Sequence, residues 1–302
     1  MKKIISFSLW GDNPLYTVGA IANAELAQKI YPGWICRFYI HVQSVPAKIT
    51  EELRSFDNVE LVEMPVDIGW SGMLWRFYPA TEPDVEVMLS RDCDSRLTYR
   101  EKACVDQWLN QHDEDDRFRR VMTIRDTCVH QSQMMGGLWG VRWGYLSFVK
   151  PHLDRLIEET RHTAQKGVDQ DFLNSKIYLY SLGLLDMNFN VLPESLQPMS
   201  EFMSFDDIAF GKKRFGNLER RPHDRELMLP TPIQRGFGEE YQTCIHCGLN
   251  HDSSFIGDVF ALSENELDYL DLSISERSER SNIIKYHELY LKNLKKYGLR
   301  PL

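Results

Sequence analysis

The stretch VEVMLSRDCDSRL, residues 85–97, runs from an apolar segment directly into two aspartates, Asp92 and Asp94. Apolar residues recur at every second position from Val85 to Leu89, which predicts a β-strand over residues 85–90. In an open parallel sheet, ligands bind outside the carboxyl ends of the strands. The stretch therefore predicts a strand of the central sheet and a candidate site immediately after it.

Strand and helix patterns alternate on both sides of this stretch. Runs of β-branched and aromatic residues predict further strands over 3–9, 34–42, 59–65 and 118–126. Apolar residues at helical spacing predict helices over 17–30, 49–57, 72–79, 98–111, 151–165 and 169–183. In the second of these helices, Thr50 is the expected N-terminal cap. This alternation predicts an α/β fold, a mostly parallel sheet with helices on both faces.

The pattern thins after residue 193, and the chain ends in an amphipathic stretch rich in lysine, SNIIKYHELYLKNLKKYGLRPL. We expect one domain over residues 1–260 and a C-terminal helical extension over residues 261–302. Packing on the body of the protein or on a second subunit is the common fate of such a helix. Its basic face is also compatible with peripheral contact to an anionic membrane surface.

Composition excludes some classes of function. The chain has 302 residues, and its net charge of −9 argues against a nucleic-acid binder, which needs a broad basic surface. The apolar run at the start ends at Gly11, too early for a signal peptide. No segment approaches the roughly 18–20 apolar residues that span a bilayer. Of the six cysteines only Cys244 and Cys247 are close together, so we expect reduced thiols and a cytoplasmic location.

Asp92 and Asp94 are the clearest candidates for a chemical role. On an extended chain, residues two apart point the same way, so their carboxylates would repel each other unless a cation lies between them. Paired carboxylate oxygens suit a hard divalent cation such as Mg²⁺ or Mn²⁺. The alternative is a loop in which each aspartate pairs with Arg91, Arg96 or a helix N-terminus.

Three further motifs have both a functional and a structural interpretation. In DQDFLN, residues 169–174, either Asp169 and Gln170 contact a sugar, or the segment is a helix N-terminus with Asp169 as its cap and its acidic residues stabilised by the helix dipole. In MMGGLWGV, residues 134–141, Gly137 either lets the backbone approach a ligand or bends a core strand. In CIHCG, residues 244–248, zinc binding competes with His246 or His251 acting as a single ligand to a metal held elsewhere, or as a hydrogen-bonded core histidine.

In their order, these motifs resemble those of nucleotide-sugar glycosyltransferases of the GT-A (Rossmann-like) fold. The likeness is greatest to the glycogenin and lipopolysaccharide-galactosyltransferase group, glycosyltransferase family 8, and covers most of residues 3–257. It rests on LYTVGAIANAEL after the first strand, Arg76 in LWRFYPA, the D-x-D of SRDCDSR, DQDFLN, and IHCGLN for the family's H-x-x-G. Two family features are absent, the asparagine of the central glycine segment and the K-P-W after the C-terminal histidine.

The resemblance implies a metal-dependent transfer of a sugar from a nucleotide-diphosphate sugar to a hydroxyl acceptor, with retention of configuration, in surface polysaccharide or lipopolysaccharide synthesis. It implies Mn²⁺ or Mg²⁺ at Asp92, Asp94 and His246, with His251 as the other candidate histidine. It also implies a donor site with the base and ribose near Asp12 and Tyr16, the diphosphate near Arg76 and Gly137, and the sugar near Asp169 and Gln170.

Two other classes remain open. A sugar nucleotidyltransferase on a related fold would carry a glycine-rich, basic phosphate loop near the N-terminus, and SFSLWGDNPLY lacks that richness. A non-catalytic GT-A-like or zinc-stabilised binding module would not require Asp92, Asp94, Asp169 and Gln170 together. Metal analysis separates the classes, because a module would hold zinc tightly and a transferase would hold Mn²⁺ or Mg²⁺ together with nucleotide.

Overall fold

The computed structural model describes residues 1–64, 69–97, 99–110, 119–125, 132–161, 166–198 and 202–206. These residues form a seven-stranded sheet in the order β3-β2-β1-β4-β6-β5-β7. The strands are β1 (Lys2–Leu9), β2 (Ile35–Ile40), β3 (Val59–Glu63), β4 (Val85–Ser90), β5 (Val121–Arg125), β6 (Trp139–Arg142) and β7 (Phe202–Asp206). β6 runs antiparallel to its neighbours β4 and β5, and all other neighbouring pairs are parallel. The predicted mostly parallel α/β fold is confirmed.

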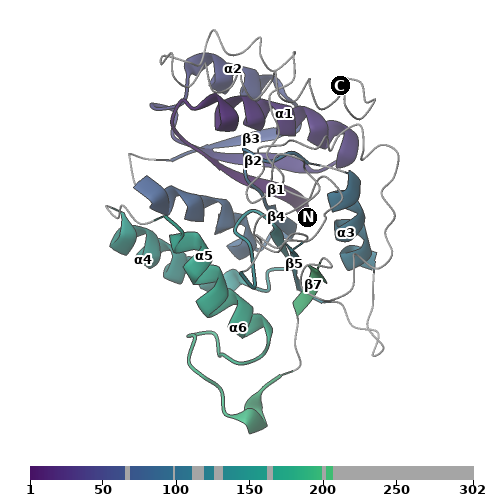
Figure 1. Ribbon diagram of the computed structural model, residues 1–302, viewed down its shortest axis with the longest axis vertical. Helices are drawn as coiled ribbons and strands as arrows, with labels where there is room; N and C mark the ends of the chain where they lie inside the picture. The colour runs from purple at the N-terminus through teal and green to yellow at the C-terminus, as the bar shows by residue number, and fades with distance from the viewer. Residues whose placement is uncertain are drawn as a thin grey trace, which may run out of the picture.

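Helices cover both faces of the sheet (Figure 1). One face carries α1 (Pro14–Ile30), α2 (Ala47–Ser55) and α3 (Tyr99–Asn110), and the other carries the 3₁₀ helix η1 (Gly69–Thr81), α4 (Lys150–Thr160), α5 (Val168–Phe172) and α6 (Tyr178–Ser181). The π-helical turn η3 (Leu173–Ile177) joins α5 to α6, and short 3₁₀ turns lie at η2 (Ser147–Val149) and η4 (Glu194–Leu196). Among the helices that the structure describes, none combines the length and apolar composition that a membrane crossing requires.

The central strands are buried on both sides, as expected for strands covered by helices on both faces. In β1, Ile5 and Phe7 pack into the core beneath α1 and α2, whereas Ile4 packs into the core beneath η1 and α4. Phe7 pairs in register with Phe38 of β2, and the two rings stack with centroids 4.7 Å apart. Alternation along the strands thus supplies two separate hydrophobic cores.

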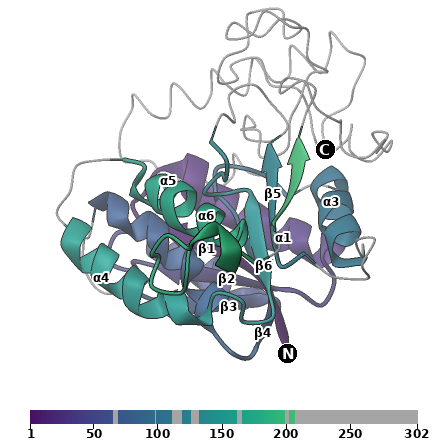
Figure 2. The same ribbon diagram turned by 90° about the horizontal axis from the view of Figure 1, so that it is seen from below.

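Several predicted boundaries differ from the structure. The expected cap Thr50 is wrong: α2 begins at Ala47, and Thr50 is buried inside it. The predicted helix over 169–183 is divided into α5, η3 and α6, and ends before Gly183, which has the left-handed φ of 79° that favours glycine. The sequence pattern gave no sign of β7, which pairs with β5 at the end of the sheet (Figure 2).

The chain order reverses at β1. From β1 the chain proceeds outward to β2 and β3, and then returns to place β4 on the other side of β1. At such a reversal the loops that leave two neighbouring parallel strands diverge, and a crevice forms at their carboxyl ends. The loop after β1 contains Asp12, and the loop after β4 contains Asp92 and Asp94. The topology therefore brings two of the predicted site segments together.

Candidate active site

A cavity of about 500 Å³ lies at this crevice. Its walls come from the loop after β1 with the start of α1, from one face of η1, from the loop after β4, and from residues 135–138 and 166–170. It is lined by all the predicted site residues that the structure describes: Asp12, Tyr16, Arg76, Asp92, Asp94, Gly137, Asp169 and Gln170. Segments as far apart as residues 12 and 170 therefore meet at one place.

Helix α1 fixes the loop that carries the two aspartates. A Cβ atom at Gly19 would collide with the carbonyl oxygen of Cys93, so the loop packs directly on the helix backbone. The Asn23 side chain donates to the Ser95 carbonyl at 2.7 Å and accepts from the Leu97 amide at 3.0 Å. These roles of Gly19 and Asn23 are not predictable from the sequence. Their only sign was the small-residue run GAIANA, which also fits an ordinary packed helix.

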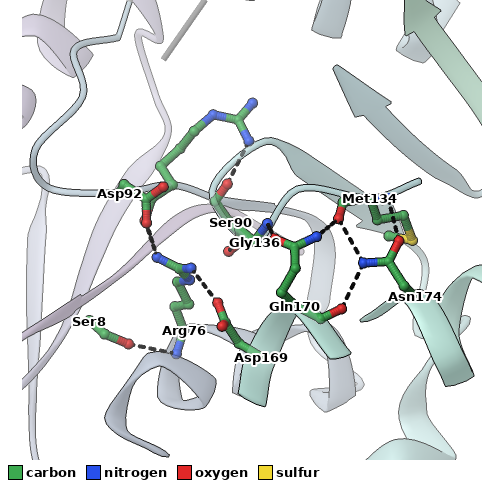
Figure 3. Close-up of polar contacts among 10 residues, drawn as sticks. Ser8, Arg76, Ser90, Asp92, Met134, Gly136, Asp169, Gln170 and Asn174 are labelled. Carbon is green, nitrogen blue, oxygen red and sulfur yellow. Dashed lines mark hydrogen bonds and ion pairs between the residues drawn. The ribbon is translucent and has the colours of Figure 1, made fainter. Parts of the chain in front are cut away.

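Arg76 joins the two acidic segments of the cavity (Figure 3). One end of its guanidinium donates to Asp92, and the other donates to Asp169 at 2.8 Å. The Arg76 and Asp169 side chains are 6% and 5% exposed, whereas that of Asp92 is 41% exposed. The backbone amide of Arg76 donates to the Ser8 hydroxyl at 3.1 Å, which ties η1 to β1.

The electrostatics of Arg76 follow from this placement. Burial alone would lower the pKa of the guanidinium, but the carboxylates of Asp92 and Asp169 more than offset that effect and raise it. Arg76 therefore holds a permanent positive charge between two aspartates that would otherwise repel each other. A buried charge that is bridged on both sides also fixes the geometry of its partners.

Arg91, although adjacent to Asp92 in sequence, has a different partner. Its guanidinium forms a buried ion pair with Glu101 of α3 at 2.7 Å, and Glu101 also accepts from the Tyr31 hydroxyl at 2.9 Å. Burial lowers the pKa of Arg91, and Glu101 more than compensates to raise it. The ion pair connects the end of β4 to α3. Arg91 is one of the partners expected for Asp92, but Asp92 pairs with Arg76 instead.

The DQDFLN segment holds the glycine segment in place. The Gln170 amide accepts from the Gly136 amide at 3.1 Å and donates to the Met134 carbonyl (Figure 3). Asn174 accepts from the Met134 amide at 2.9 Å and donates to the same carbonyl at 3.2 Å. Asp169 lies in the first turn of α5, and its carboxylate reaches Arg76. The alternative in which Asp169 caps the helix is wrong, because Gly167 is at the N-cap.

The two glycines are required by close packing against charged groups. A Cβ at Gly136 would lie 2.5 Å from a carboxylate oxygen of Asp169 and 2.7 Å from a guanidinium nitrogen of Arg76. A Cβ at Gly137 would collide with the carboxylate of Asp92. The backbone of this segment therefore closely approaches the charged centre of the cavity. At Gly137 the neighbour is the Asp92 side chain, and the approach of a ligand stays a prediction.

The residues present suit a hard cation as far as they are described. Asp92 and Asp94 provide carboxylate oxygens on one cavity, and Asp92 is partly exposed. In the described ranges no group of three or more metal-binding side chains occurs. His246, His251, Cys244 and Cys247 lie outside the described residues, as does the C-terminal extension over 261–302.

No protein-family model and no curated protein matches this chain. Among solved structures it is similar to a glycosyltransferase involved in glycosylation of the major capsid of PBCV-1, with 11% identity, a TM-score of 0.38, and 68% of this chain and 82% of that chain covered. It is similar to the galactosyltransferase LgtC in complex with donor and acceptor sugar analogues, with 13% identity, a TM-score of 0.33, and 57% and 70% covered. It is also similar to 4-diphosphocytidyl-2C-methyl-D-erythritol synthase from Anaerococcus prevotii, with 10% identity, a TM-score of 0.36, and 57% and 83% covered. At such scores the activity has to be argued from this chain's own site.

Proposed function

We propose that this protein is a metal-dependent glycosyltransferase of the GT-A type, which transfers a sugar from a nucleotide-diphosphate sugar to a hydroxyl acceptor. One observation carries the proposal. Eight residues that the sequence predicts for this chemistry, from five separate segments, line a single cavity at the reversal point of the sheet. A structural role for each motif separately gives no reason for all of them to meet at one cavity.

Asp92 and Asp94 would hold Mn²⁺ or Mg²⁺, with His246 as the proposed third ligand. When bound, such an ion acts as a Lewis acid and neutralises charge on a departing diphosphate. The protein's own contribution at this point is Arg76, whose fixed charge lies beside Asp92 and is positioned before any substrate arrives. The glycine backbone at Gly136 and Gly137 lets the side chains of Arg76, Asp92 and Asp169 pack closely against it.

The other residues divide the cavity into regions. Asp12, which is exposed, and Tyr16, which is half-buried, would contact the base and ribose. Asp169 would face the donor sugar, with its carboxylate oriented by Arg76. Gln170 lines the same region, and its amide holds the glycine segment rather than pointing freely into the cavity.

The resemblance further leads us to propose hexosyl transfer with retention of anomeric configuration, to an acceptor in surface polysaccharide or lipopolysaccharide synthesis. NMR analysis of the first product formed, before any mutarotation, tests the stereochemistry. An inverted product would overturn this part of the proposal while leaving sugar transfer intact.

Thermal unfolding against a panel of nucleoside diphosphates and sugar nucleotides, with and without Mn²⁺, tests the main proposal. A ligand that binds only the native state at about one hundred times its Kd adds about 2.7 kcal/mol of stability. We expect stabilisation that needs both Mn²⁺ and one nucleotide. Asp94→Ala should abolish it, whereas Asp106→Asn, which alters a partly exposed aspartate of α3 outside the cavity, should not.

Two outcomes would favour the other classes. Release of pyrophosphate from a nucleoside triphosphate in the presence of a sugar phosphate would identify a nucleotidyltransferase. No stabilisation by any nucleotide, together with unfolding on addition of a zinc chelator, would identify a zinc-stabilised module.

A further inference from the structure

One face of η1 forms a continuous wall of the cavity. Trp70, Met73 and Arg76 all line it, and they are spaced three residues apart. In a 3₁₀ helix, side chains three residues apart lie directly above one another. The wall therefore runs from the charged end at Arg76, through Met73, to an aromatic end at Trp70. At about 2.0 Å per residue, the two ends are roughly 12 Å apart along the helix.

The aromatic end has a fixed geometry. Trp70 packs edge-on against Trp10, with centroids 6.5 Å apart and planes at 83°. Trp10 in turn packs edge-on against Trp75, which is buried, at 6.1 Å and 78°. A Cβ at Gly72 would lie 3.4 Å from the Trp10 ring, so that ring also rests on the η1 backbone. Trp10 and Trp70 are both half-buried and line the cavity, so they present a rigid apolar surface to a ligand.

A lysine from a different segment of the cavity lining lies next to this surface. Lys166 is exposed, lines the cavity, and places its ammonium group 5.3 Å from the centroid of the Trp70 ring. It makes no ion pair among the described residues, in contrast to Arg76, whose charge is balanced by Asp92 and Asp169. The aromatic end thus combines two indole surfaces with a positive charge that has no carboxylate partner in the described part of the chain.

We propose that Trp10, Trp70 and Lys166, here called the aromatic subsite, bind the acceptor and select a saccharide that carries a negatively charged group. The inference rests on the proposed function, since the charged end would be taken by the metal and the diphosphate. A sugar ring presents apolar C–H surfaces that pack on an indole, and Lys166 would pair with a carboxylate or phosphate substituent. Lys166 lies beside Trp70, and Trp70 and Arg76 are roughly 12 Å apart along η1, so Lys166 would meet a group on the ligand other than the diphosphate.

Isothermal titration calorimetry, with Mn²⁺ and the nucleotide selected by the unfolding panel both present, tests the subsite. The probes are matched pairs: methyl glucuronide with methyl glucoside, methyl galacturonide with methyl galactoside, and glucose 6-phosphate with glucose. We expect at least one anionic member to bind more tightly than its neutral partner, by about two- to fivefold, as for an exposed ion pair. Preference for a uronide or for the phosphate identifies which substituent carries the charge.

Variants assign the preference to residues. Lys166→Met should abolish the charge preference and leave nucleotide binding unchanged, whereas Lys166→Arg should retain the preference. Trp70→Ala should weaken charged and neutral saccharides alike. Lys176→Met is the matched control, since Lys176 lies 5.8 Å from the Phe189 ring and outside the cavity lining.

The possible failures are distinguishable. Equal binding within every pair, or a preference that survives Lys166→Met, overturns the aromatic subsite while nucleotide binding still supports the proposed function. A loss of nucleotide binding in Lys166→Met would move Lys166 to the donor site and also overturn the inference. Failure of every nucleotide to bind would overturn the proposed function itself.

Discussion

Arg76 connects two acidic residues of the cavity lining. Its guanidinium holds Asp92 of the loop after β4 and Asp169 of α5, and both the guanidinium and Asp169 are almost fully buried. Removing one member of a buried ion pair leaves an uncompensated charge, which costs far more than the loss of a surface pair. The same ion pairs therefore contribute to the stability of the fold and fix the positions of Asp92 and Asp169 in the cavity.

We expect Arg76→Met to lower the free energy of unfolding by about 3–5 kcal/mol, because Asp169 would remain buried without its partner. Arg76→Lys should lose less, since it keeps the charge but cannot bridge two carboxylates with one planar group. Urea unfolding measures both variants.

The double variant Arg76→Met/Asp169→Asn should recover part of the loss, since it removes the buried charge as well. Arg54→Met is the control, because Arg54 and Glu63 form an exposed pair that should contribute at most about 1 kcal/mol. Equal losses for Arg76→Met and Arg54→Met would contradict the importance assigned to burial of the bridge.

The sequence singled out residues that line one cavity, but not their pairings. Asp92 and Asp94 are recognisable because polar residues directly follow an apolar strand, and Asp169 because it opens a helix. Nothing in the local pattern separates Arg91 from Arg76 as a partner for Asp92. Arg91 pairs with Glu101, and Arg76 pairs with Asp92 although η1 is distant from Asp92 in sequence. Both pairings depend on three-dimensional packing.

At the scale of elements, α1 determines where the aspartate loop lies. Gly19→Ala should destabilise the protein by about 1–3 kcal/mol, because its Cβ would push into the Cys93 carbonyl and backbone cannot move aside cheaply. Alanine is the better helix former, so a loss of stability isolates the steric effect. Thermal or urea unfolding measures it, and Mn²⁺-dependent nucleotide binding should weaken in parallel.

Gly72→Ala in η1 is the control for that experiment. A Cβ there would make an ordinary contact of 3.4 Å with the Trp10 ring, so the change should cost less than Gly19→Ala. A neutral or stabilising Gly19→Ala would show that the loop does not depend on direct contact with the α1 backbone.

The contact between η3 and the glycine segment gives a second prediction at this scale. Asn174→Ala should cost about 1–3 kcal/mol, because the Met134 amide would lose its acceptor. Hydrogen exchange should then become faster at the Met134 amide. Asn110→Ala is the control, since Asn110 is exposed and its side chain donates to the Asp106 carbonyl within α3. Unchanged exchange at Met134 in Asn174→Ala would show that other contacts hold the segment.

Element boundaries were predicted less accurately than element types. Thr50 fits the preferences for a helix cap, but α2 begins earlier because Ile49 and Leu53 pack into the core. The strand β7 was missed because its local pattern is weak and its position depends on pairing with β5, far away in sequence. Tertiary contacts override local preference in both cases.

At the scale of the whole molecule, alternating strand and helix patterns predicted the fold class, but not the order of the strands. The strand order determines where the cavity forms, because the reversal at β1 puts the loops after β1 and β4 side by side. The antiparallel direction of β6 was also not predictable, since MMGGLWGV has the same apolar character in either direction. Strand order depends on the packing of two cores that a local pattern does not specify.

The three-residue spacing along η1 has a consequence for the evolution of this protein. Because each residue of a 3₁₀ helix turns by about 120°, inserting or deleting one residue between Trp70 and Arg76 would rotate one of them out of the cavity. Exchanges of one side chain for another at Trp70 or Met73 leave the register intact. Relatives of this chain should therefore vary in amino-acid identity along this wall while keeping the length of the segment constant.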